Sequence, residues 1–243
     1  MALASTGKPG PAFERFLSWK SDKKISINED FSSDLEVYRR SAETSLQTQH
    51  RDLAASLQKS LEDTILNILD QFTPSRPEGL CIAGGVALNC RLNQRIREKF
   101  KPKRMFVQPA ANDAGTALGA ALEAHALTMP GSPAWTMTTA TLGPDFTDDE
   151  IAAALDTAGA SYRRPKDLCR ETAKMLADGK IIGWFQGRLE FGPRALGSRS
   201  LLADPRRADI KDRVNKLKSR HAWRPFGPSI LAGHEPQWFE DAF

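Results

Sequence analysis

The 243-residue sequence contains no apolar run that approaches the length of a membrane-spanning helix. Its N-terminus lacks the charged start and apolar core of a signal peptide. Its three cysteines fit neither a disulfide framework nor a zinc-site spacing, and no internal repeat or low-complexity segment is present. We therefore expect a cytoplasmic protein without a membrane partner. The composition, 40% hydrophobic and 26% charged, is typical of a globular chain of one large or two ordinary domains.

The net charge of +4 is unevenly distributed along the chain. Between Gly187 and Arg224 there are eleven lysine and arginine residues against four acidic residues. A basic surplus of this kind suits nucleotides, acyl phosphates or nucleic acid as partners.

The most distinctive stretch is the glycine- and arginine-rich segment 187–200. The apolar run 181–185 precedes it and predicts a buried strand. Glycines and a proline then predict a loop whose backbone can approach a ligand closely. Arg188, Arg194 and Arg199 supply forked, permanently charged donors that suit phosphate or carboxylate. An anion site is the functional interpretation, and a solvated basic loop is the alternative.

Two further junctions join a predicted strand to a predicted helix. The apolar run 80–83 leads through Gly84 and Gly85 into a helical pattern that continues through Leu92 and Ile96. This junction is either a phosphate cradle at a helix N-terminus or a tight turn. After the predicted strand 105–107, Asp113 precedes the small-residue helix 116–127, which we expect to pack closely against a neighbour. Asp113 is either a helix N-cap or a metal ligand.

Four other segments have helical patterns. Residues 51–72 predict an amphipathic helix, residues 147–155 a helix with a Thr147–Glu150 capping box, residues 167–176 a third, and residues 208–218 a basic helix. The stripe expected to form core in the first of these consists of Leu53, Leu57, Leu61, Ile65, Ile68 and Leu69.

Several motifs together, in their order along the chain, resemble those of one enzyme family. They are the segments 84–90 (GGVALNC), 112–121 (NDAGTALGAA), 190–200 (EFGPRALGSRS), 218–220 (KSR) and 224–229 (RPFGPS). This series resembles the O-carbamoyltransferases of antibiotic and nodulation-factor biosynthesis, over essentially the whole chain.

The resemblance implies an α/β protein of two domains. Residues 1–130 would be the C-terminal part of an actin/Hsp70-like ATPase domain, similar to the threonylcarbamoyl transferases. Residues 139–243 would be the start of a YrdC-like domain. In the family, carbamoyl phosphate and ATP react in the YrdC-like domain to give carbamoyl adenylate and pyrophosphate. The carbamoyl group then passes to a substrate hydroxyl in the first domain, beside a divalent metal usually reported as iron.

The resemblance also assigns roles to residues of this chain, which is then a two-site enzyme. By position, the residues that would bind carbamoyl phosphate and the triphosphate, with its Mg²⁺, are Arg194, Arg199, Ser200, Lys218, Arg220 and Arg224. Gly84, Gly85 and Asn89 would hold the adenylate at a remote transfer site, with Gly187 and Gly192 as further cofactor-binding glycines. Asp113 would match the family's metal-ligand aspartate, for Fe(II) once the family's histidines are supplied.

The sequence departs from the family pattern at both ends. It contains no His-x-x-x-His, and its four histidines are scattered. We therefore interpret the chain as the middle of a longer enzyme, with a small-molecule hydroxyl acceptor and with a homodimer left open for the full-length form. Two alternatives remain. One is a nucleic-acid-binding module. Such modules stack bases on exposed aromatic rings, whereas Trp184, Phe185 and Phe226 lie in apolar sequence contexts that predict core positions. The other is an inactive fragment that serves as an interaction partner.

Overall fold

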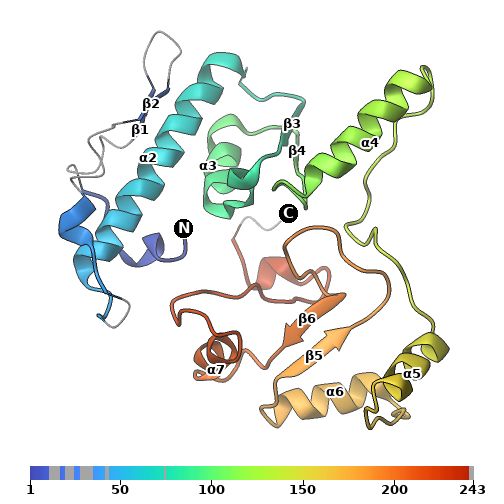
Figure 1. Ribbon diagram of the computed structural model, residues 1–243. Coiled ribbons are helices and arrows are strands. Elements are labelled where there is room, and N and C mark those ends of the chain that lie inside the picture. Colours follow the sequence, from blue (N-terminus) through green and yellow to red (C-terminus); the bar gives the residue numbers. More distant parts are fainter. Residues whose placement is uncertain (11–16, 20–24, 28–34, 42–43, 74, 241–243) are drawn as a thin grey trace. The chain divides into compact units, whose positions relative to one another are not determined.

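The computed structural model describes residues 1–10, 17–19, 25–27, 35–41, 44–73 and 75–240 (Figure 1). Its helices are α2 (Thr48–Phe72), α3 (Cys90–Phe100), α4 (Gly115–Thr128), α5 (Asp148–Thr157), α6 (Leu168–Ala177) and α7 (Ile210–Leu217). Its strands are β1 (Leu17–Trp19), β2 (Ile25–Ile27), β3 (Gly79–Ile82), β4 (Arg104–Val107), β5 (Ile182–Phe185) and β6 (Arg199–Leu202). Short 3-10 turns are η1 (Ala4–Thr6), η3 (Glu36–Tyr38), η4 (Gly85–Leu88) and η5 (Glu235–Gln237). The α/β class is thus confirmed.

The chain divides into two compact units. Unit 1 comprises Met1–Ile151 and Phe185–Arg199, and unit 2 comprises Ala152–Trp184 and Ser200–Phe243. The actin/Hsp70-like and YrdC-like assignments, and the domain boundaries expected from the resemblance, stay predictions. Among the described residues, no helix is both long and apolar enough to cross a bilayer.

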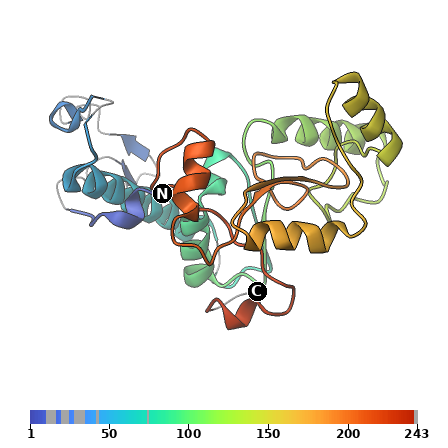
Figure 2. The same ribbon diagram turned by 90° about the horizontal axis from the view of Figure 1, so that it is seen from below.

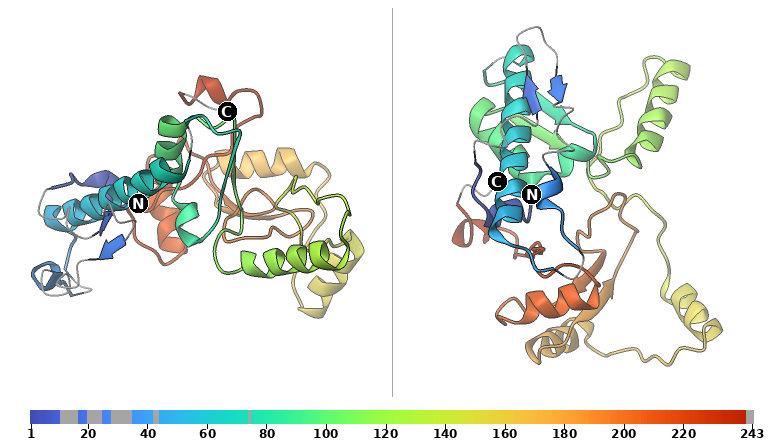
Figure 3. Two further views of the ribbon diagram at one scale, coloured as in Figure 1. Left: turned by 90° about the horizontal axis from the view of Figure 1, so that it is seen from above. Right: turned by 60° about the vertical axis from the view of Figure 1, so that its left-hand side comes forward.

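Unit 1 is built on a strand–helix–strand core. β3 and β4 pair in parallel, from Gly79 opposite Arg104 to Ile82 opposite Val107, as two strands linked by a helix can do. α3 connects them and lies beside α2 in all views (Figures 1, 2 and 3). The buried cluster consists of Leu66, Leu92, Ile96 and Phe100, with Leu80, Ile82 and Met105 packed against it. The helical pattern predicted through Leu92 and Ile96 is confirmed, and both residues are buried, at 2% and 1% exposure.

The predicted apolar stripe of α2 is partly wrong. Ile65 and Leu69 do pack against the core cluster, but Leu57 is 44% exposed. The fully buried positions instead include Gln58, Glu62 and Leu66. The polar members can be buried because they are hydrogen-bonded: Gln58 Nε2 donates to Glu62 Oε1 (2.7 Å). The hydrophobic periodicity of the sequence marks the positions of apolar residues, but it does not show which polar residues form hydrogen bonds that allow them to be buried.

α4 was expected to pack closely, and within the described residues it does not. None of its residues is buried, and Leu127 is 73% exposed. Its small and apolar residues are distributed around the helix, so no single stripe marks a face for burial.

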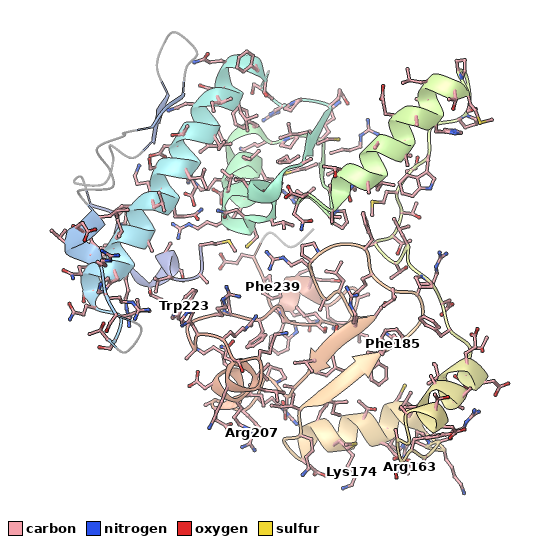
Figure 4. The ribbon with its side chains drawn as sticks, viewed as in Figure 1. Arg163, Lys174, Phe185, Arg207, Trp223 and Phe239 are labelled. Carbon is pink, nitrogen blue, oxygen red and sulfur yellow. The ribbon has the colours of Figure 1, made fainter. Side chains whose placement is uncertain are left out.

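In unit 2, β5 and β6 form a two-stranded sheet and run in opposite directions (Figure 1). The prediction that the apolar run into β5 is buried is wrong, because Phe185 is 48% exposed. Figure 4 labels the Phe185 side chain beside this sheet. The predicted helix starts are confirmed. Asp167 caps α6 by accepting from the Arg170 N–H (3.0 Å). Thr147 and Glu150 form the capping box at the start of α5, since the Glu150 N–H donates to Thr147 Oγ1 (3.3 Å) and the Thr147 N–H to Glu150 Oε2 (2.8 Å).

Candidate anion-binding site

Residues 187–199, here called the glycine–arginine loop, are held by backbone hydrogen bonds. The Gln186 N–H donates to the Ser198 carbonyl (2.9 Å) and closes the base of the loop. Residues 140–144 run beside it: the Gly143 N–H donates to the Leu189 carbonyl (2.9 Å), and the Phe191 N–H to the Ala140 carbonyl (2.7 Å). The loop is therefore part of the fold of unit 1 rather than a free surface excursion.

Glu190 is the internal brace of this loop. It is 6% exposed, and its Oε1 accepts from the Leu196 N–H (2.8 Å) and the Ser198 N–H (2.9 Å). Its Oε2 is buried and has no hydrogen-bond partner among the described residues. These two hydrogen bonds from backbone N–H groups to one carboxylate fix the backbone that carries Arg194 and Arg199. The sequence motifs assigned no role to Glu190, although a single acidic residue within a basic loop was an available signal.

The three arginines of the loop have different surroundings. Arg188 is used by the fold, since its Nε donates to the Gly143 carbonyl (2.8 Å) and its Nη2 to the Leu142 carbonyl (3.2 Å). Arg199 donates to the Glu190 carbonyl (3.4 Å), and Arg194 is exposed. Within the described part of the chain, neither Arg194 nor Arg199 has a carboxylate partner, so both charges remain available to an anion.

The loop lies against both segments that were expected to form a separate transfer site. Arg194 Nη2 donates to the carbonyl of Leu88 (3.3 Å), three residues after Gly85. Gly192, at φ 116°, approaches Pro109 so closely that an added Cβ would lie 2.6 Å from the Pro109 carbonyl oxygen. Only glycine tolerates this backbone at this separation. The structure thus brings Arg194 and Gly192 together with residues expected to be remote from them.

The Gly84–Gly85 junction does not open directly into a helix. Gly84, at φ 93°, precedes the 3-10 turn η4, and α3 begins only after Asn89. Asn89 Oδ1 accepts from the Leu92 N–H (3.2 Å), and its amide exchanges hydrogen bonds with Gln58 (2.9 and 3.2 Å). Asn89 itself caps α3 through the Leu92 N–H, and the phosphate cradle expected at this junction stays a prediction. Adenylate binding by Gly84, Gly85 and Asn89 stays a prediction.

Asp113 is exposed and does not cap α4. The N-cap of that helix is Ala114, and no side chain caps it. Among the described residues, no group of three or more His, Cys, Asp or Glu side chains could hold a metal ion. A single exposed carboxylate is a poor site for a divalent ion, so the residues present do not fit the metal that the resemblance implied.

A cavity of about 410 Å³ lies between η1, α2 and α3. Its cations are matched by acids: Lys59 pairs with Asp63, and Arg91 Nε lies 3.1 Å from Glu62 Oε1. A lining in which charges are already paired offers little attraction to a phosphate.

In unit 2, the candidate residues lie on and after α7. Residues 218–226, here called the basic turn, begin with a Schellman-type helix end: Ser219, at φ 50°, donates to Lys216, and the Arg220 N–H donates to Asn215 (both 3.0 Å). Asp204 pairs with Arg206 (2.7 Å) and Asp209 with Arg207 (3.2 Å) and Arg213 (3.7 Å). Lys218, Arg220 and Arg224 have no such partner in the described chain. Ser200 lies half-buried on β6.

Arg220 and Arg224 are two like charges placed close together. Partial burial, and then the charge of Arg224, lower the pKa of Arg220. The Arg220 guanidinium lies 4.3 Å from the centroid of the Phe226 ring, and Arg224 lies 5.9 Å from that of Trp223. Two uncompensated cations held in this way favour an anionic ligand.

The aromatic side chains of this region are more exposed than expected. Phe185 and Phe226 are 48% and 42% exposed, so the expectation that they lie in the core is wrong. Each already contacts the protein: Phe226 lies under Arg220, and Phe185 lies 6.4 Å from Phe146 between ring centroids.

Comparison with known proteins matches two family models to the chain. The model for the carbamoyltransferase N-terminus matches residues 1–122, and the model for the carbamoyltransferase C-terminus matches residues 173–243. The chain belongs to the carbamoyltransferase family. The glycine–arginine loop and the basic turn both lie within the carbamoyltransferase C-terminus match.

Three curated proteins illustrate what the chain is similar to. The chain is 39% identical to nodulation protein NolNO of Sinorhizobium fredii over 99% of its length, and 42% identical to nodulation protein NolO of Bradyrhizobium diazoefficiens over 79%. It is 38% identical to the 3'-hydroxymethylcephem-O-carbamoyltransferase of Amycolatopsis lactamdurans over 72%. The matches span 37%, 36% and 32% of those proteins, so the chain corresponds to about a third of each.

Proposed function

We propose that this chain binds carbamoyl phosphate and ATP as part of an ATP-dependent O-carbamoyltransferase. The observation that carries the proposal is the set of cations without an acid partner: Arg194 and Arg199 on the glycine–arginine loop, and Lys218, Arg220 and Arg224 on the basic turn. Neighbouring arginines are neutralised by Asp204 and Asp209, which supports a functional reason for leaving these free.

The proposed chemistry has two half-reactions. Hydrolysis of carbamoyl phosphate gives carbamate and orthophosphate. The carbamate oxygen then bonds to the α-phosphorus of ATP while the α–β anhydride bond breaks, which releases pyrophosphate and forms carbamoyl adenylate. In the second half-reaction the oxygen of an acceptor hydroxyl attacks the carbamoyl carbon, AMP leaves, and the hydroxyl proton passes to solvent.

The chain's own residues would contribute positioning and charge. Negative charge develops on phosphate oxygens in the first half-reaction, and fixed guanidinium groups stabilise it without reorganising. Mg²⁺ would accompany ATP. Arg194 and Arg224 are exposed and can contact a ligand. The Arg220 side chain instead donates hydrogen bonds within the turn, to Asn215 and to the Pro225 carbonyl. By analogy with the cephem relative, the acceptor would be a small molecule with a free hydroxyl.

The test is the release of pyrophosphate from ATP with and without carbamoyl phosphate. We expect pyrophosphate and orthophosphate in equal amounts, only when carbamoyl phosphate is present, and a loss of release in Arg224→Ala. Equal release without carbamoyl phosphate, or no release under any condition, would refute the proposal.

Nucleic-acid binding is a second candidate because Phe185 and Phe226 are exposed in a basic part of the sequence. A titration with tRNA across salt concentrations separates the two. A steep loss of affinity with salt would indicate phosphate-backbone contacts, and weak binding without that slope would remove this candidate.

A further inference from the structure

Asn215 is the most enclosed polar residue of the basic region. It lies in the last turn of α7 and is 1% exposed. Its Nδ2 donates to the carbonyls of Ala222 (3.2 Å) and Arg224 (3.0 Å). Its Oδ1 accepts from Arg220 Nε (2.6 Å), and its backbone carbonyl accepts from the Arg220 N–H (3.0 Å). One buried amide therefore contacts both ends of the segment 220–224.

We propose that Asn215 is a positioning residue that sets the basic turn for phosphate binding, by locking the Arg220 side chain and the Arg224 backbone. This inference rests on the proposed function, and it names a residue to which neither the sequence nor the resemblance gave a role.

The hydrogen bonds show why this position requires an amide. Of the side chains of this size, only asparagine presents an acceptor to Arg220 and two donors to carbonyl oxygens at once. With Nε held by Asn215 and Nη2 donating to the Pro225 carbonyl (3.3 Å), the Arg220 guanidinium is fixed over the Phe226 ring. Arg220 thus supports the turn through its hydrogen bonds and keeps its positive charge. The backbone of Arg224 is held by Asn215.

Arg220 and Arg224 carry like charges, and Asn215 hydrogen-bonds to the Arg220 side chain and to the Arg224 carbonyl, so it restrains both residues against their mutual repulsion. Because Arg220 and Arg224 are already held in place before the anion binds, binding does not have to order them at a cost in conformational entropy.

The experiment measures binding of inorganic pyrophosphate and of carbamoyl phosphate to the 243-residue chain by calorimetry, in wild type, Asn215→Ala, Asn215→Asp and Arg220→Lys. We expect each variant to bind pyrophosphate about tenfold more weakly or worse, since a buried donor or acceptor loses its partner. Asn215→Asp keeps the acceptor for Arg220 but loses both donors. Asn67→Asp, the same change at an exposed position of α2, is the matched control and should bind as wild type does.

A double variant and a spectroscopic readout separate positioning from general stability. If Asn215 acts through Arg220, then Asn215→Ala combined with Arg220→Lys should bind no more weakly than the weaker single variant. The Arg220 Nε–H resonance should be protected from exchange in wild type and lose that protection in Asn215→Ala.

The outcomes distinguish this inference from the proposed function. A folded Asn215→Ala or Asn215→Asp that binds pyrophosphate as tightly as wild type overturns the inference. So does a loss of affinity that follows a loss of fold in both Asn215 variants while Arg220→Lys binds normally. A wild-type chain that binds pyrophosphate but not carbamoyl phosphate, with the variants weakened, retains the role of Asn215 and counts against the proposed function. Binding of neither anion overturns both.

Discussion

The Arg194 guanidinium donates to the Leu88 carbonyl over 3.3 Å, although the two residues are 106 positions apart in the chain. This contact joins the glycine–arginine loop to the segment after Gly84 and Gly85. Two motifs that the resemblance assigned to different sites are thus neighbours within unit 1, and Arg194 is exposed although it donates to the Leu88 carbonyl.

Arg194 and Arg188 offer a matched pair of substitutions. We expect Arg194→Ala to weaken carbamoyl phosphate binding about tenfold with little change in unfolding free energy, because a charge-assisted hydrogen bond to the ligand is lost. Arg188→Ala should cost about 1 kcal/mol of stability, since two carbonyl contacts disappear, and should leave affinity close to wild type. Calorimetric titration and denaturant unfolding of both variants measure this. The reverse pattern would mean that Arg188 binds the ligand.

Glu190 should be required for the stability of the loop. Replacing it by alanine leaves the Leu196 and Ser198 N–H groups without their acceptor, and we expect a loss of about 2 kcal/mol. Glu190→Gln retains an acceptor and should lose less. Denaturant unfolding of both variants measures the difference, with Glu123→Ala on exposed α4 as the control. Equal stability of wild type and Glu190→Ala would show that the brace has no energetic effect.

Asp204 provides a prediction about pH. Hydrogen bonds from the Arg206 side chain, and then from its backbone N–H, lower the pKa of Asp204 from 3.8 to about 2. Because the folded pKa is the lower one, the carboxylate stabilises the fold above pH 3.8, and this contribution disappears as the pH falls to about 2. An NMR titration of the Asp204 carboxyl should give a midpoint near 2 in wild type. A midpoint near 3.8, or no change in Arg206→Ala, would contradict the pairing.

Ser219 occupies a backbone region that glycine adopts more easily. At φ 50° it forms the left-handed end of α7. We expect Ser219→Gly to stabilise unit 2 by about 1 kcal/mol, because the left-handed conformation costs a residue with a Cβ about that much. Ser219→Ala, which keeps the Cβ, should show no such gain. Denaturant unfolding of both variants checks this, and a gain in alanine as large as in glycine would point to a different cause.

The sequence predicted those features whose determinants are local. The Thr147–Glu150 capping box depends on residues three apart, and the helix that begins after Asp167 and the helix that contains Leu92 and Ile96 follow from helical spacing. The buried face of α2 could not be predicted, because the partners of Gln58 include Asn89, which lies 31 positions later in the chain. Asn215 gave no signal either, since its partners lie in an irregular turn whose path depends on Asn215 itself.

The ordered motifs predicted the family, which the comparisons confirm, whereas the chemistry and the site residues that they implied stay predictions. The arginine-rich segments are where an anion would be bound, but sequence could not separate Arg188, which the fold uses, from Arg194, which it leaves exposed. That distinction depends on the path of residues 140–144 beside the loop.

The most direct test of the account is to incubate the protein with carbamoyl phosphate labelled at carbon and ATP labelled at the α-phosphate, and to separate the nucleotide products. We predict one product that carries both labels, and its absence in Arg224→Ala. Labels that remain in separate compounds, although the wild-type protein binds both substrates, would contradict the proposed formation of carbamoyl adenylate.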